Sequence, residues 1–163
     1  MLFGGGEAFK SYINEEINSI DSSLSYEIKN YLTDLLYFYL FSERLFEHKS
    51  ENGRSYEKTL VDLYIRTSEA DLQERIYLFK KMGDLSLYIS GFFRVAVEKR
   101  ITDLSYYEDV GQSAYHYLAD HYKDRDIIFN SLSEKFKVLS EILFFIQQKS
   151  EAKNEEKYLK ITK

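Results

Sequence analysis

The chain lacks proline, cysteine and tryptophan, and only seven of its 163 residues are glycine. At an average usage of about 5 %, a chain of this length would contain roughly eight prolines. Because proline removes a backbone donor and clashes with the preceding helical turn, its absence predicts a chain that is helical nearly throughout. The absence of cysteine excludes disulfide bonds, thiol catalysis and zinc–thiolate sites.

Concentrated positive charge and long apolar runs are missing as well. The net charge is −5, and the basic residues alternate with acidic ones, so we expect no nucleic-acid partner. The longest apolar run, LLYFYLF at residues 35–41, is far shorter than the roughly 20 residues of a membrane span. The segment MLFGGGEAFK, residues 1–10, contains neither a basic leader nor an apolar signal core. We therefore expect a cytoplasmic protein that does not bind membranes.

The residues that are present indicate one globular helical domain. Apolar residues make up 44 % of the chain and charged residues 30 %, which is enough for a real core. We predict an all-α, single-domain bundle over residues 1–148. Its six predicted helices cover about residues 7–20, 21–47, 56–66, 69–100, 104–123 and 125–148. The stretch HKSENGRS, residues 48–55, is the clearest loop, and the charged residues 149–163 are expected to form a solvated, mobile tail.

The predicted helix at 21–47 is apolar around most of its circumference in the stretch LLYFYLFSERLF, residues 35–46. A helix of this kind is surrounded, so it is either the central helix of the bundle or a helix with one face against another chain. In the second interpretation Tyr37, Tyr39 and Phe41 form the interface. The fifteen tyrosines of the chain fit an interface or a ligand pocket, and they also fit a general compositional bias.

The segment KKMGDLSLYISGFFRVAVEKR, residues 80–100, has helical periodicity although it contains two glycines and two serines. At 100° per residue, its bulky residues fall on one face and a small, partly polar face lies opposite. The bulky face contains Leu85, Tyr88, Ile89, Phe92, Phe93 and Ala96, and the small face contains Gly83, Leu87, Ser90, Gly91 and Arg94. Each glycine costs about 1 kcal/mol relative to alanine in a helix, which indicates that another group approaches this backbone closely.

The predicted helix at 104–123 has Gly111 and Ala114 at the centre of its own apolar stripe. Small residues in a packing face allow two backbones to approach each other. We therefore predict a closely packed central hairpin, in which the helices at 69–100 and 104–123 cross small face to small face. The close-packing residues are Gly83, Ser90, Gly91, Gly111 and Ala114.

In the alternative interpretation, the small side chains leave room for a ligand between these two helices. The candidate pocket residues are Ser90, Arg94, Tyr107 and Tyr115. Arg94 is suited to a carboxylate or phosphate of a ligand or partner, or it pairs with Glu98 one turn away.

No arrangement of catalytic or metal-binding residues is recognisable in the sequence. His48, His116 and His121 do not occur in the Glu-x-x-His pairs that bind metal ions in helical bundles. The glycine-rich stretch GGGEAFKS, residues 4–11, lacks the Gly-Lys-Ser/Thr ending of a phosphate-binding loop. We therefore predict no catalytic residue, no metal and no cofactor.

The run GDLSLYISGFF at residues 83–93, followed by DLSYYEDVGQSAYHYLA at residues 103–119, resembles a pattern that recurs in a family of uncharacterised all-helical proteins of bacteria. The resemblance implies a bacterial cytoplasmic protein in which the hairpin of the helices at 69–100 and 104–123 is the defining element. It implies no catalytic residue.

The leading prediction for function is a non-enzymatic protein-interaction or regulatory module with a protein partner. It follows from the missing catalytic arrangements, the acidic charge and the apolar, aromatic character of the helix at 21–47. The alternative is a small-ligand-binding protein or enzyme with a tyrosine-lined pocket between the helices at 69–100 and 104–123. A structural homo-oligomer, such as a homo-dimer with the helix at 21–47 at its seam, is a further alternative.

Overall fold

A computed structural model describes residues 2–45, 54–100 and 103–162, with side chains at 6–41, 55–100 and 103–152. The chain is an all-α single domain of about eight helices, and the described residues contain no strand. The helices are α1 (Leu2–Ile20), α2 (Tyr26–Leu45), α3 (Arg54–Thr67), α4 (Leu72–Phe92), α5 (Arg94–Glu98), α6 (Leu104–His121), α7 (Asp126–Glu134) and α8 (Phe136–Thr162). A short 3-10 helix, η2 (Lys123–Arg125), joins α6 to α7. Most of the predicted loop at 48–55 lies outside the described residues.

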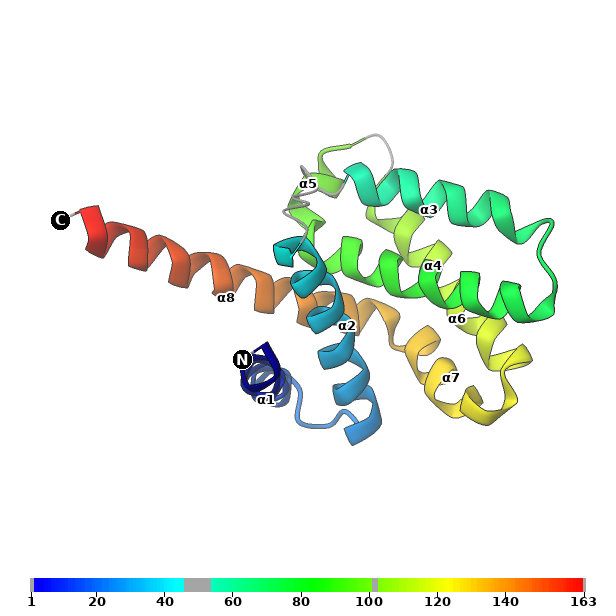
Figure 1. Cartoon of the computed structure of the whole chain (residues 1–163), viewed down its shortest axis with the longest axis horizontal. Coiled ribbons are helices and arrows are strands. Elements are labelled where there is room, and N and C mark those ends of the chain that lie inside the picture. Colours follow the sequence, from blue (N-terminus) through cyan, green and yellow to red (C-terminus); the bar gives the residue numbers. More distant parts are fainter. Residues whose placement is uncertain (1, 46–53, 101–102, 163) are drawn as a thin grey trace.

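The centre of the bundle is α4, which packs against α2, α3, α6 and α8 (Figure 1). Its buried residues form an unbroken run in its second half: Leu85, Ser86, Leu87, Tyr88, Ile89, Ser90 and Gly91. The interpretation of the helix at 21–47 as the central one is therefore wrong. On α2 the side chain of Phe38 is 57 % exposed. We attribute the central place of α4 to its glycines and serines, because small side chains allow neighbours to approach from several directions.

The side chains of two neighbouring helices occupy the space beside two glycines. A Cβ atom on Gly83 of α4 would lie 2.6 Å from Cε1 of Tyr115 on α6, and a Cβ atom on Gly111 of α6 would overlap the ring of Phe136 on α8. These glycines therefore make room for aromatic rings. The predicted arrangement, with the small face of one helix against the small face of the other, does not describe these contacts.

A close approach of backbones is found between α4 and α8. A Cβ atom on Gly91 would lie 2.5 Å from Cβ of Leu143 and 3.1 Å from the main-chain oxygen of Ser140. The other two small residues of the predicted contact, Ser90 and Ala114, are buried as well. Gly91 thus lies in a tight contact, but its partner is the last helix rather than α6.

A break at Phe93 separates α4 from α5, where the sequence predicted one helix over 69–100. Phe93 has φ −115° and ψ 24°, which are not helical values. Ser90 and Gly91 precede the break, and adjacent serine and glycine residues are a common cause of sharp kinks. In addition, the carbonyl oxygen of Ser90 accepts a hydrogen bond from Nε of Arg94 at 3.2 Å. A side chain therefore satisfies an acceptor at the end of α4.

A second break, at Lys135, divides the predicted helix at 125–148 into α7 and α8. Lys135 has φ −97° and ψ 10°. Next to the break, Oγ of Ser133 donates to the main-chain oxygen of Gln112 on α6 at 2.9 Å, and Phe136 packs against Gly111. These two contacts fix the change of direction between α7 and α8.

The last helix is longer than the sequence predicted. It continues to Thr162, beyond residue 148, and its C-terminal part extends away from the other helices (Figure 1). The mobility expected for residues 149–163 stays a prediction. Neither α8 nor any other described helix is both long enough and apolar enough to cross a membrane.

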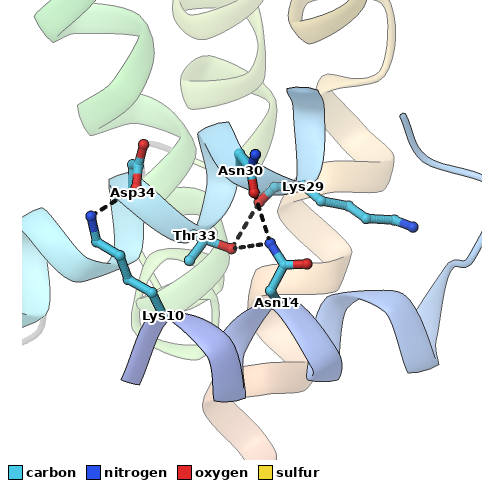
Figure 2. A network of polar contacts seen from close by, with 6 residues as sticks. All are labelled: Lys10, Asn14, Lys29, Asn30, Thr33 and Asp34. Carbon is cyan, nitrogen blue, oxygen red and sulfur yellow. Dashed lines mark hydrogen bonds and ion pairs between the residues drawn. The ribbon is translucent and has the colours of Figure 1, made fainter. Parts of the chain in front are cut away.

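Polar contacts fix α1 on α2 (Figure 2). Nδ2 of Asn14 donates to Oδ1 of Asn30 at 3.1 Å and to Oγ1 of Thr33 at 3.2 Å. Nζ of Lys10 pairs with Oδ1 of Asp34 at 3.1 Å. Because Asp34 also lines the cavity described below, α1 determines which charges remain available there.

Candidate ligand-binding site

The four candidate pocket residues do not meet in one pocket. Ser90 is buried, and its hydroxyl donates to a main-chain oxygen of its own helix at 3.0 Å. The guanidinium of Arg94 donates to Oγ of Ser140 in α8 at 2.8 Å and lies 5.2 Å from the ring centroid of Phe144. Arg94 therefore links the junction of α4 and α5 to α8. The expected pair with Glu98 is not among the ion pairs of the described residues.

The two candidate tyrosines on α6 contact carboxylates on different helices. The hydroxyl of Tyr107 donates to Oε1 of Glu57 in α3, which also accepts from Arg100. The hydroxyl of Tyr115 donates to Oδ1 of Asp84 in α4 at 2.8 Å. Asp84 also lines a large cavity, and the candidate site is built around it.

The carboxylate of Asp84 is the shared acceptor of three donors. Its Oδ1 accepts the hydroxyls of Tyr31 from α2 and Tyr115 from α6. Its Oδ2 lies 2.9 Å from the ammonium of Lys80, one turn earlier in α4. The side chain of Asp84 is only 15 % exposed, so these contacts replace much of the water that would otherwise stabilise the charge.

The tyrosines near Asp84 stay protonated at physiological pH. Burial raises the pKa of Tyr31 and of Tyr115 well above the usual value of 10.0, and the adjacent charge of Asp84 raises both further. Burial followed by the same charge also raises the pKa of Tyr39. The hydroxyls therefore donate hydrogen bonds and do not act as bases.

A cavity of about 720 Å³ lies between α2, α3 and α4, with Asp84 in its wall. Five aromatic side chains line it: Tyr31, Phe38, Tyr39, Tyr56 and Tyr77. Its volume falls within the roughly 300–1,000 Å³ of small-molecule sites. Three leucines and seven polar or charged residues also line it, and the convergence of apolar and polar side chains is typical of such sites.

Ring contacts hold the aromatic wall of the cavity in place. The ring of Tyr39 is stacked on that of the buried Tyr88, with centroids 4.6 Å apart and an interplanar angle of 12°. The ring of Tyr56 meets Tyr39 edge-on, at 5.9 Å and 85°. Tyr39 was suggested by the sequence as an interface residue, but in the structure it lines the cavity.

The other two candidate interface residues pack beside α1. The ring of Tyr37 is stacked on Phe41 at 5.4 Å and 20°, and its centroid lies 6.0 Å from that of Phe9. Nζ of Lys10 lies 4.9 Å from the Tyr37 centroid. Tyr37 and Phe41 thus lie on a different side of α2 from Tyr39. An interface with another chain at these residues stays a prediction.

Charged side chains line the cavity beside its aromatic wall. Nζ of Lys81 lies 5.0 Å from the ring centroid of Tyr77. Arg125, from η2, also lines the cavity and is exposed. Asp34 lines it too, but its carboxylate is paired with Lys10 (Figure 2).

The histidines of the described chain lie on the surface. His116 is 3.5 Å from Asp120, and both side chains are more than half exposed. The ring of His121 is stacked on Tyr117 with centroids 4.0 Å apart. His48 lies outside the described residues. Within the described part of the chain, no group of three or more histidine and acidic side chains could hold a metal ion.

Sequence reasoning missed the cavity, although two of its helices, α2 and α4, carry a usable signal. On α4 the lining residues are Tyr77, Lys80, Lys81, Asp84 and Leu85, and on α2 they are Tyr31, Asp34, Leu35, Phe38 and Tyr39. Both sets have the spacing i, i+3, i+4, i+7, i+8, which places them on one helical face. A face that mixes tyrosine with charge is neither a regular core stripe nor a regular solvent face. This mixture is the sequence signal from which the cavity could have been predicted.

Comparisons with protein-family models, with curated proteins and with solved structures return no match for this chain. The resemblance to a bacterial helical family therefore stays a prediction, and the site has to be interpreted from its own geometry.

Proposed function

We propose that the protein binds a small molecule in the cavity between α2, α3 and α4. The observation that carries this proposal is the convergence of five aromatic side chains and the hydrogen-bonded carboxylate of Asp84 on a cavity of about 720 Å³. The sequence-based alternative, a tyrosine-lined pocket, is kept, but its place changes from the α4–α6 contact to this cavity.

The polar groups of the cavity fit the binding of a ligand better than catalysis. Tyr31 remains a neutral donor because burial raises its pKa, and the Asp84 carboxylate already accepts three hydrogen bonds. A catalytic group has to exchange protons or electrons with a substrate. Groups that are hydrogen-bonded to one another in this way instead determine the shape of a binding site. We therefore interpret the protein as a ligand-responsive regulatory or carrier module.

The test uses N-phenyl-1-naphthylamine, a neutral aromatic dye that becomes fluorescent in apolar surroundings. Thr59 lines the cavity from α3, and the substitution Thr59→Trp would place an indole at the opening. Lys58, on the same helix, is exposed and does not line the cavity, and Lys58→Trp is the matched control. We expect saturable dye binding that Thr59→Trp weakens at least about tenfold and Lys58→Trp leaves unchanged. Absence of saturable binding, or equal effects of the two substitutions, would refute the proposal.

A protein-interaction role is the second candidate, and the outer face of α3 favours it. Val61, Tyr64 and Ile65 are 49 %, 66 % and 62 % exposed, and their spacing places them on one helical face. An exposed apolar patch of this kind, with Lys58 and Asp62 of opposite charge beside Val61, is compatible with self-association about a two-fold axis. The partner in this proposal is a second copy of the chain. Light scattering over a range of concentrations tests it: a dimer that Tyr64→Asp dissociates supports the proposal, and a monomer at all concentrations refutes it.

A further inference from the structure

We propose that the ligand of this cavity is an amphipathic anion, with a flat apolar body and a carboxylate, sulfonate or phosphate group at one end. This inference rests on the proposed function. It follows from which charges around the cavity are already paired and which are not.

The acidic groups of the cavity are each paired with a lysine of the protein. Asp84 is paired with Lys80 at 2.9 Å and accepts two tyrosine hydroxyls. Asp34 is paired with Lys10 from α1 at 3.1 Å (Figure 2). Neither carboxylate is therefore available to a cationic ligand unless an existing ion pair breaks.

Two basic groups of the cavity, Lys81 and Arg125, are not paired in the same way. Among the described residues, neither Lys81 nor Arg125 forms an ion pair. The contact of Lys81 is with the face of the Tyr77 ring, which attracts a cation but leaves its charge uncompensated. Two positive charges thus remain beside the cavity, one from α4 and one from η2.

The charge of Arg125 acts on the interior of the cavity. Burial is the main cause that raises the pKa of Tyr31 and the charge of Asp84 raises it further, whereas the positive charge of Arg125 lowers it to a smaller extent. Arg125 is therefore close enough to Tyr31 to interact with a charge at that position. A ligand anion between Arg125 and Lys81 would interact with both.

The apolar body of the ligand would lie against the aromatic wall. The ring of Tyr39, which is stacked on the buried Tyr88, and the edge of Tyr56 offer fixed ring surfaces, and Leu35, Leu63 and Leu85 also line the cavity. Flat ring systems pack well against such surfaces. A cationic ligand would instead meet Lys81 and Arg125, and repulsion would oppose its entry.

The test compares two dyes with the same ring system. Anilinonaphthalene sulfonate carries a sulfonate, and N-phenyl-1-naphthylamine lacks it. We expect the sulfonate dye to bind the wild-type protein more tightly, with an affinity that falls as salt is added. Lys81→Gln and Arg125→Gln should each weaken the sulfonate dye about three- to fivefold, as for partly exposed ion pairs. Neither should change the binding of the neutral dye. Lys123→Gln is the matched control, because Lys123 is exposed in η2 and does not line the cavity.

The outcomes separate this inference from the proposed function. If the neutral dye binds in a manner sensitive to Thr59→Trp, but the sulfonate gives no advantage or Lys123→Gln acts as strongly as Arg125→Gln, the cavity is a binding site and the ligand is not an anion. If neither dye responds to Thr59→Trp, both proposals are wrong. Circular dichroism and melting curves of each variant confirm that these surface substitutions leave the fold intact.

Discussion

The ring of Tyr115 fills the space beside Gly83, where a Cβ atom would lie 2.6 Å from its Cε1 atom. The hydroxyl at the other end of the same ring donates to Asp84, the residue that follows Gly83. Two adjacent positions of α4 thus fix both ends of one side chain of α6. The packing of the bundle centre and the polar wall of the cavity therefore depend on each other.

The first prediction concerns Gly83→Ala. Alanine is favoured over glycine in a helix by about 1 kcal/mol, but the new methyl group would displace a ring that is fully buried. Overpacking of this kind costs about 1–3 kcal/mol, so after the gain in helix propensity we expect a net loss of up to roughly 2 kcal/mol in the free energy of unfolding. Urea denaturation measures it.

Gly6→Ala is the matched control for this prediction. A Cβ atom on Gly6 would also come close to a tyrosine, at 2.9 Å from the hydroxyl oxygen of Tyr37. That atom is the free end of a side chain that can turn away. We expect Gly6→Ala to leave stability unchanged or to raise it by up to about 1 kcal/mol. Equal losses for both substitutions would contradict the contrast between the two sites.

The second prediction concerns Gly111 and Phe136. Gly111→Ala would push a methyl group into the ring of Phe136, and we expect a loss of about 1–3 kcal/mol in unfolding free energy. In a Phe136→Leu background the ring is absent, so the additional cost of Gly111→Ala should fall to about half or less. Thermal melts of the four proteins complete the cycle. Strictly additive effects would show that the two residues do not compete for the same space.

The third prediction concerns alkaline pH. The folded protein raises the pKa of Tyr31 and Tyr115 above the usual value of 10.0, through burial and then the charge of Asp84. A raised pKa means that the protonated form is favoured in the folded state. The stabilisation is therefore complete below about pH 10, the unfolded pKa, and is lost as the pH rises further. Melting temperatures measured between pH 7 and pH 11.5 should fall steeply only above about pH 10.

Variants that lack these hydroxyls test the cause of that fall. Tyr115→Phe removes a titrating group, so its melting temperature should fall less steeply above about pH 10, although it starts lower at neutral pH because Asp84 loses a donor. Tyr26 is 73 % exposed, and Tyr26→Phe should keep the wild-type slope. If Tyr115→Phe also keeps that slope, the buried hydroxyl is not the source.

The fourth prediction concerns Arg94 and Ser140. Their hydrogen bond at 2.8 Å joins the junction of α4 and α5 to α8. In a double-mutant cycle of Arg94→Met and Ser140→Ala, we expect a coupling of about 0.5–1.5 kcal/mol. A second cycle that combines Arg94→Met with Glu98→Gln should show none. Coupling between Arg94 and Glu98, and none between Arg94 and Ser140, would show instead that Arg94 forms the intrahelical pair suggested by the sequence.

Helix positions follow from the sequence where periodicity is regular. The residues Ile128, Leu132, Phe136, Leu139, Leu143 and Ile146 recur at three- and four-residue steps, and all of them are buried except Ile128, which is half-buried. The interruption at Lys135 is not predicted, because it depends on contacts of Ser133 and Phe136 with α6. The break at Phe93 has a local warning in the pair Ser90 and Gly91, but the glycine could equally mark a contact in an unbroken helix. Local signals of this kind leave both outcomes open.

The candidate site was less predictable than the helices. The acceptor role of Asp84 requires Tyr31, which is 53 residues away in the chain, and Tyr115, which is 31 residues away. No local pattern joins these three residues. The cavity depends in the same way on the angles between α2, α3 and α4, which periodicity does not specify. The sequence did indicate close contacts between α4 and α6, which Gly83 and Tyr115 make, but it indicated neither the contact of Gly91 with α8 nor the cavity between α2, α3 and α4.

The central position of α4 has a consequence for how the molecule opens. Amide groups in a helix that is covered on several sides exchange with solvent only when a large part of the structure opens, whereas helices with an exposed side exchange through local fluctuations. The cavity joins α4 to α2 and α3, which have exposed faces. A molecule bound there would contact helical segments whose amide hydrogens exchange slowly and segments whose amide hydrogens exchange faster. Binding should therefore slow hydrogen exchange mainly in α2, α3 and the first half of α4, where Tyr77 is 53 % exposed, with little change in the buried second half of α4.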